Sequence, residues 1–299
     1  MYICIKKRMQ LIVYIFLYPF LWLISILPFR LLYLFSDFVY VIIYRLIGYR
    51  KKTVRANLKL AFPNLSEGER LEIEKKSYIH LCDMFLEMIK TISISRKEIE
   101  SRFRFTNLDV YHELEKKQKS IALMCAHYAS YEWVVSMNHY VNFKGYGIYK
   151  KIANPHFDKL VKDIRSKYEA YLITTKETKA TIEENAKNNV LGIYGFASDQ
   201  TPRWSNKLYW HHFMGIETPI HIGAESLAKQ YNMNVIYLRV KKIRRGYYEA
   251  TFDIMTDDVQ SIPNYKLSED FMARVEQQIY EQPEYYLWTH KRWKHKKQE

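Results

Sequence analysis

Two long apolar stretches open the sequence and set it apart from the rest of the chain. Residues 11–29 (LIVYIFLYPFLWLISILPF) carry no charged side chain, and residues 31–48 are apolar apart from Asp37 and Arg45. About 20 consecutive apolar residues are enough for a helix that crosses a bilayer. A cleaved signal peptide has a shorter apolar core that ends at small residues, whereas the first stretch ends in Pro-Phe-Arg. The pattern therefore predicts a retained membrane anchor.

Basic residues flank this anchor on both sides and leave its path through the membrane open. Lys6, Lys7 and Arg8 precede the first stretch, and residues 50–55 hold further Arg and Lys. Positive flanks favour the cytoplasmic side, so two helices that enter and return fit the pattern, and a single span remains possible. We expect residues 1–48 to form the anchor, as one or two helices.

Beyond the anchor, the pattern changes to a helical stretch and then to short apolar runs separated by amphipathic segments. Ser66 and Glu69 form a capping box that predicts the start of a helix. Strands are predicted at 120–126, 146–152, 189–196 and 233–243, with a hairpin partner at 247–255 and helices near 156–168 and 222–230. This alternation predicts an α/β fold with a mixed sheet flanked by helices. Residues 49–299 would form a single catalytic domain.

Composition narrows the class of partner. The chain has 46 Lys and Arg against 32 Asp and Glu, a net charge of +14, and 26 Tyr. Basic and aromatic residues together suit either nucleic acid or a membrane–water interface. An uncharged run of this length has no use in a soluble nucleic-acid module, so we expect a membrane partner and no nucleic acid. The three cysteines are far apart, which favours reduced thiols over a zinc site or a disulfide framework.

The most promising chemistry lies at the end of the predicted strand 120–126, in the segment CAHYASYEW. Open α/β sheets bind ligands at the carboxyl ends of their strands, which is where His127 stands. On a regular helix His127 and Glu132 would lie about 140° apart, so they meet only if a turn separates them. Glu132 would then accept the imidazole N–H and leave the other nitrogen to act as a base. The alternative is two ordinary polar residues at a strand end.

Five ordered segments carry a resemblance to a known family. They are YRKKTVRANLKLAFPNLS (49–66), AHYASYEW (126–133), NPHFDKLVKDIRSKY (154–168), ASDQTPR (197–203) and QPEYYLWTHKRWKHK (282–296). Together they resemble the bacterial lipid A biosynthesis acyltransferases, within the lysophospholipid acyltransferase superfamily. The family signature, a histidine followed after four residues by an acidic residue, falls on His127 and Glu132. The family often has Gly-Asn-Trp before the acid, where this chain has Ala129-Ser130-Tyr131.

The resemblance implies an enzyme on the cytoplasmic face of the inner membrane. It implies transfer of a fatty acyl chain from acyl carrier protein to a hydroxyl of a phosphorylated lipid A precursor, with no metal and no cofactor. Arg165 matches an arginine near the phosphorylated substrate or the thioester carbonyl, although a solvated helix charge explains it equally well. Other substrate contacts are expected from Asp199 and Gln200, which follow one strand and could shape the pocket or support Arg165. Tyr149 and Lys150, which end another strand, could contact a headgroup.

Two rival functions remain open at this point. One is an acyltransferase that acts on a phospholipid, aminolipid or other glycolipid. The other is a non-catalytic membrane-surface protein that uses basic aromatic patches such as WTHKRWKHK, in which Trp288 and Trp293 would lie at headgroup depth. A packed helix end is the alternative reading of those two indoles.

Overall fold

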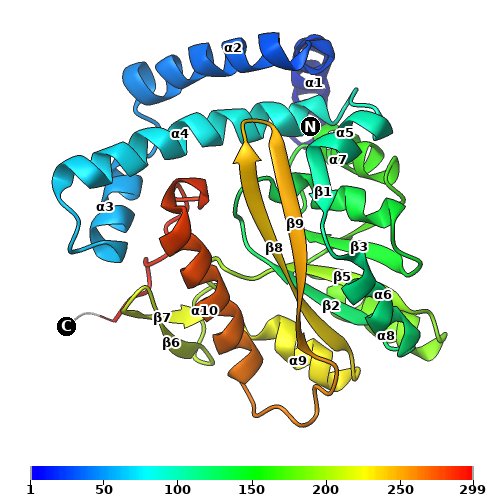
Figure 1. Ribbon diagram of the computed structural model, residues 1–299. Helices are drawn as coiled ribbons and strands as arrows, with labels where there is room; N and C mark the ends of the chain where they lie inside the picture. The colour runs from blue at the N-terminus through cyan, green and yellow to red at the C-terminus, as the bar shows by residue number, and fades with distance from the viewer. Residues whose placement is uncertain (1, 298–299) are drawn as a thin grey trace.

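The fold has one mixed sheet with helices around it, as the alternating pattern predicts (Figure 1). The computed structural model describes residues 2–297, with side chains from Arg8 onward. The helical elements are α1 (Tyr2–Ile26), α2 (Phe29–Tyr40), the π-helix η1 (Val41–Ile47), α3 (Lys51–Ala61), α4 (Glu67–Lys90), α5 (Arg96–Arg102), α6 (Leu108–Lys116), the 3₁₀ helix η2 (Tyr131–His139), α7 (Pro155–Ser166), α8 (Thr178–Lys187), α9 (Gly223–Gln230), α10 (Lys266–Glu281) and η3 (Pro283–Tyr285). The strands are β1 (Phe103–Phe105), β2 (Ile121–Cys125), β3 (Lys144–Tyr149), β4 (Ala170–Thr174), β5 (Gly192–Ala197), β6 (Tyr209–Phe213), β7 (Ile216–Ile220), β8 (Asn234–Arg244) and β9 (Tyr247–Thr256).

The main sheet has seven strands in the order β1-β9-β8-β2-β5-β3-β4. The hairpin β8–β9 is antiparallel, and every other pair is parallel. The strands predicted at 120–126, 146–152, 189–196 and 233–243, and the hairpin partner, correspond to β2, β3, β5, β8 and β9. Strands β6 and β7 form a separate antiparallel pair. The expected fold class is confirmed.

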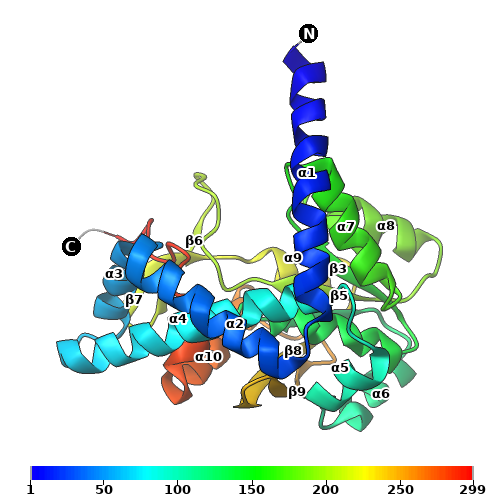
Figure 2. The same cartoon turned by 90° about the horizontal axis from the view of Figure 1, so that it is seen from above.

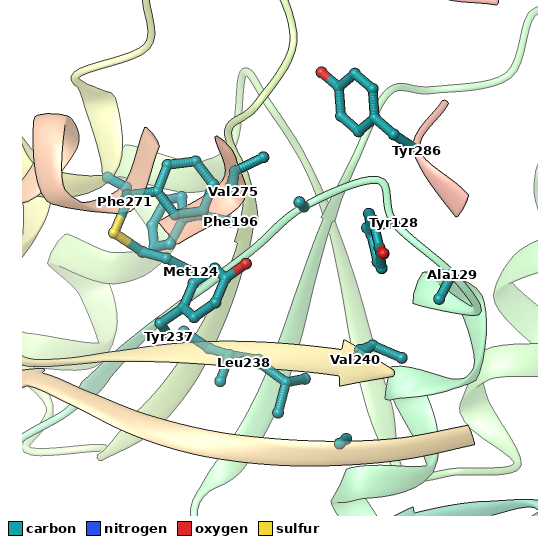
Figure 3. Close-up of a cluster of buried hydrophobic side chains, with 14 of the residues drawn as sticks. Met124, Tyr128, Ala129, Phe196, Tyr237, Leu238, Val240, Phe271, Val275 and Tyr286 are labelled. Carbon is teal, nitrogen blue, oxygen red and sulfur yellow. The ribbon is translucent and has the colours of Figure 1, made fainter. Parts of the chain in front are cut away.

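Strand β2 is central because its sequence leaves no polar face. Ile121, Ala122, Leu123 and Met124 are all buried, as a strand covered on both faces requires. On one side of the sheet, Met124 and Phe196 pack near Tyr237 of β8 and Phe271 of α10 (Figure 3). This packing fixes the level at which β2 and β5 end, and so positions the residues that follow them.

The second apolar stretch packs on the domain through polar contacts as well as apolar ones. Pro28 separates α1 from α2, and α2 lies along α4 (Figure 1). The Ser36 hydroxyl donates to Asp83 at 2.7 Å, and the Tyr33 hydroxyl donates to Glu87 at 2.8 Å. Asp83 and Glu87 are fully buried, so these bonds join α2 to the interior of the protein.

Buried Asp83 joins α4 to the β8–β9 hairpin. Its carboxylate accepts from Arg245 Nε at 2.9 Å and lies 3.6 Å from Lys242 Nζ. Lys242 is itself buried, so without Asp83 its charge would lose this compensation. Removing one partner of a buried ion pair typically costs about 3–5 kcal/mol.

Replacing Asp83 by asparagine will therefore lower the free energy of unfolding by about 3 kcal/mol, measured by thermal or urea unfolding followed by circular dichroism. Asp37→Asn is the matched control, because Asp37 also pairs with Arg245 but is 53% exposed. We expect it to cost less than about 1 kcal/mol. Equal losses in the two variants would show that burial of Asp83 does not matter.

Candidate active site

His127 and Asp199 lie together because they end two neighbouring strands. Strands β2 and β5 are parallel, with Cys125 opposite Ala197 in the last registered pair. Two residues further along each chain segment, His127 Nδ1 lies 2.8 Å from Asp199 Oδ1. The same carboxylate oxygen accepts the backbone N–H of His127 at 3.1 Å. Asp199 is therefore the carboxylate that orients the imidazole.

A tight turn follows His127, as the spacing to Glu132 requires. Ala129 adopts φ +50°, in the left-handed region, and η2 begins at Tyr131. The turn is held by residues near the C-terminus: Ala129 N–H donates to the carbonyl of Tyr285 at 3.0 Å, and Leu287 N–H donates to the carbonyl of His127 at 3.2 Å. Figure 3 shows Tyr128 and Ala129 on this loop, with Tyr286 above them.

Glu132 reaches the site, but its hydrogen-bond partner differs from the expected one. The sequence predicts a bond from the imidazole to Glu132, whereas the structure pairs Glu132 Oε2 with Arg165 Nη2 at 2.5 Å. Asp199, expected to shape the pocket or support Arg165, contacts His127 instead. The physical reason is register: β5 brings Asp199 directly beside His127, and η2 directs Glu132 toward α7.

The electrostatics of the pair follow from these contacts. Burial alone would lower the pKa of His127, but the Asp199 carboxylate, through its charge and its hydrogen bond, raises that pKa above its ordinary value. The nearby Glu132 charge acts in the same direction. Burial would raise the pKa of Asp199, yet the contacts with His127 hold it below its usual range. The imidazole is therefore a stronger base than an isolated histidine.

His127, Glu132 and Arg165 line one cavity of about 690 Å³. Pairing between β3 and β5 ends at Gly147 and Gly195, while β3 stays paired with β4 as far as Tyr149. The sheet thus opens between β3 and β5, and neither glycine puts a side chain into the opening. Apolar side chains from several elements form much of the wall: Leu123, Val134, Val135, Ile148, Leu172, Ile193, Phe196 and Leu227. The volume and the apolar lining suit a lipid-like ligand.

The remaining predicted residues lie at the edge of this cavity. Gln200 is half-buried, and Lys150 is exposed; both line it. Tyr149 lines it too, but its hydroxyl is occupied by donation to the Asp158 carboxylate at 3.1 Å. Arg165, also on the lining, stands in the last turn of α7 with 22% of its side chain exposed.

The C-terminal segment packs against the site rather than presenting its indoles to solvent. Trp288 and Trp293 are 2% and 4% exposed, so the predicted headgroup position is wrong for both and the packed alternative holds. His290 Nε2 accepts the backbone N–H of Thr201 at 3.3 Å, two residues after Asp199. Burial lowers the pKa of His290 to about 4, which keeps it a neutral acceptor at physiological pH. No sequence pattern singled out His290 as a support of the site.

A histidine–carboxylate pair at strand ends, opening onto an apolar cavity, is a site suited to acyl transfer, and comparison with known proteins identifies the class as an acyltransferase. The profile of the family described as bacterial lipid A biosynthesis acyltransferase matches residues 5–295. The chain therefore belongs to that family, which confirms the resemblance seen in the sequence. It is also similar to the lipid A biosynthesis lauroyltransferase of Escherichia coli (strain K12), with 22% identity over 275 residues, 92% of this chain and 89% of that protein.

Proposed function

We propose that this acyltransferase moves a fatty acyl chain from the thioester of acyl carrier protein to a hydroxyl of a lipid A precursor, with His127 as the general base. The observation that carries the proposal is the His127–Asp199 pair, whose imidazole lines the cavity. Nδ1 is taken by Asp199, and within residues 8–297 no hydrogen bond occupies Nε2. Nε2 is the nitrogen that would receive the proton.

The transfer balances with one proton shuttled by His127. The acceptor hydroxyl gives its proton to Nε2 as its oxygen bonds to the thioester carbonyl carbon, and the carbonyl oxygen becomes an oxyanion. The C–S bond then breaks, the carbonyl re-forms, and the imidazolium returns the proton to the departing sulfur. Asp199 stabilises the imidazolium between these two steps, because its carboxylate stays ionised beside Nδ1.

Glu132 and Arg165 act together in this proposal. A guanidinium presents several N–H donors in a fixed plane, and the bond to Glu132 fixes the direction of that plane. Arg165 lines the same cavity as His127, so its remaining donors suit the developing oxyanion or a phosphate of the acceptor. Glu132 thereby positions the arginine rather than the histidine.

Charge and apolar surface support the choice of partners. The net charge of +14 favours an acidic carrier protein and a phosphorylated lipid. Lys150 and Lys179 stand exposed on the cavity lining, where either partner would approach. Helix α1, from Arg8 to Ile26, is long and apolar enough to associate with a membrane, and we place the enzyme on the cytoplasmic face of the inner membrane.

The test is reconstitution of the purified protein with acyl carrier protein charged with a fatty acid and with a lipid A precursor, followed by mass spectrometry of the lipid. The product should gain the mass of one fatty acid less one water. Acyl-coenzyme A in place of the charged carrier is the donor control, and a phospholipid with a free hydroxyl is the acceptor control. Equal transfer to the phospholipid would contradict the proposed acceptor, and preference for coenzyme A would contradict the proposed donor.

Replacing Arg165 by lysine will lower kcat about 10²-fold, because a lysine keeps the charge but loses the planar set of donors. Steady-state kinetics with the charged carrier protein measures this. Arg96→Lys is the control, because Arg96 lies on α5 with 62% of its side chain exposed. An unchanged kcat in Arg165→Lys would show that only the positive charge of Arg165 matters and not its planar set of donors.

A further inference from the structure

Helix α1 turns a stripe of mixed polar and apolar side chains toward the protein and an apolar surface outward. Among its described side chains, those that are half-buried or buried recur every three or four positions, which places them on one stripe: Gln10, Tyr14, Tyr18, Leu21, Ile24 and Ser25. The exposed side chains include Ile12, Phe16, Phe20 and Leu23, with exposed fractions of 52 to 70%. The outer surface of α1 is thus apolar over residues 9–26, and exposed Arg8 precedes this surface.

The protein holds α1 at two places along its length, one near its middle and one at its C-terminal end. Near the middle, Gln10 Nε2 donates to the carbonyl of Ala153 at 3.1 Å, and Asn154 Nδ2 donates to the carbonyl of Gln10 at 3.1 Å. The Tyr14 ring packs on Phe157 with centroids 5.3 Å apart.

At the C-terminal end of α1, the Ser93 hydroxyl donates to the carbonyl of Ser25 at 2.5 Å, and Lys90 Nζ donates to the carbonyl of Leu27 at 2.8 Å. The two sets of contacts are about 22 Å apart along the helix, at 1.5 Å per residue from Gln10 to Ser25. From Gln10 to Ser25 the helix is therefore docked on the domain, and its first turns extend beyond the domain (Figure 2).

Helix α2 extends the same face. Figure 1 shows α1 end-on beside α2, with α4 beneath both, and Figure 2 shows both helices lengthwise from above. Leu34 and Phe38 of α2 are 65% and 59% exposed on the side away from the domain. The two views agree that both axes run along this face of the molecule.

A docked α1 that crossed a bilayer would carry part of the domain into the hydrocarbon. The contacts of Gln10 and Tyr14 tie the helix to the β3–α7 loop and the first turn of α7. Lys150, Lys151 and Lys159 stand exposed in and beside this region. Charged side chains in the bilayer core are costly, so the docked arrangement and a spanning helix exclude each other.

We propose that α1 and α2 lie in the plane of the membrane as one interfacial platform, so that the enzyme enters a single leaflet and does not span the bilayer. The inference rests on the proposed membrane association and specifies its geometry. Arg30 stands exposed on α2 and Arg45 on η1, which directly follows α2, where anionic lipid headgroups would meet them. Asp37, the acidic residue of the same stretch, is already paired with Arg245.

Depth measurements by spin labelling test the platform. Single cysteines at Ile12, Phe16, Phe20 and Leu23 of α1, and at Leu34 and Phe38 of α2, carry a nitroxide in vesicles of phosphatidylethanolamine and phosphatidylglycerol.

The Cys4→Ser variant is the background into which each cysteine is introduced. The two remaining thiols, Cys82 and Cys125, are unreactive at neutral pH because burial raises the pKa of each to about 12. Glu113→Cys, at an exposed position of α6, is the aqueous control. Collision with oxygen and with a water-soluble nickel complex gives the depth of each label.

If the platform lies in the membrane plane, all six labels should have the same depth to within about 5 Å, which is the rise of one helical turn. A spanning helix instead spreads residues 12 to 23 over about 16 Å, and this gradient would overturn the inference. The inference would also be overturned if the six labels were as accessible to the nickel complex as the Glu113→Cys control. That result would show that this face stays in water. Each labelled protein is assayed for acyl transfer as well, so a depth gradient with transfer intact refutes the platform alone. Absent transfer at uniform depth refutes the proposed reaction alone.

Discussion

Replacing His127 by alanine will reduce kcat for acyl transfer by about 10²–10⁴-fold, the usual contribution of a positioned general base. The structure gives two reasons for a large effect. His127 is the imidazole on the cavity wall whose Nδ1 is fixed by a buried carboxylate, and its pKa is raised by that carboxylate. Transfer is measured as the acylated lipid formed per unit time, by mass spectrometry.

The control for this variant is His212→Ala, which removes an exposed imidazole from β6. We expect its rate to match that of the unaltered protein. Binding of His127→Ala to vesicles should also be unaffected, because the imidazole lies in the cavity and not on α1 or α2. A protein that only bound membranes would show the opposite ranking, with His127→Ala harmless and removal of C-terminal basic residues damaging.

Replacing Asp199 by asparagine will lower kcat by about 10² or more, and it will move the acid limb of the pH profile to lower pH. The base works when His127 is neutral, so activity rises as pH passes the pKa of His127. That pKa is raised mainly by Asp199, against burial that lowers it. Without the carboxylate charge the pKa falls, and neutral imidazole persists to lower pH, although it has lost the partner that stabilises the imidazolium.

The matched comparison is Glu132→Gln, which removes a carboxylate that lines the cavity, unlike that of Asp199. Glu132 also raises the pKa of His127, but less than Asp199 does, so the limb should shift less. Its main effect should be to free Arg165, with a loss of rate close to that of Arg165→Lys. A larger shift in Glu132→Gln than in Asp199→Asn would restore Glu132 as the partner of the imidazole.

The apolar pattern alone was enough to predict the interior of the fold. β2 and residues 235–238 of β8 are continuous apolar runs, and such runs are typical of strands buried on both faces. The short strand β4, Ala170–Thr174, was not predicted because it forms the edge of the sheet and only Ile173 is buried. The hairpin β6–β7 was also missed, since its separate pairing leaves no periodic signal in the sequence.

The sequence was enough to select the histidine of the candidate site but not its carboxylate partner, because that partner depends on strand pairing. The histidine could be predicted because it follows a single recognisable strand. The partner of the imidazole depends on which strand lies beside β2 and in what register, and neither is readable from β2 itself. Once β5 is known to pair with Cys125 opposite Ala197, Asp199 falls beside His127 by counting two residues along each strand. Proximity in sequence instead favoured Glu132.

The C-terminal segment has a consequence for the order in which the enzyme becomes active during synthesis. The loop that carries His127 is held by Tyr285 and Leu287, and the Tyr128 hydroxyl donates to the carbonyl of Gln282, 154 residues further along the chain. A nascent chain that has already made the sheet therefore lacks these supports until residues 282–287 leave the ribosome. The loop that carries His127 is thus completed late, after α1 and α2 have long been available to the membrane. A chain that terminates early would reach the lipid surface without a functional site.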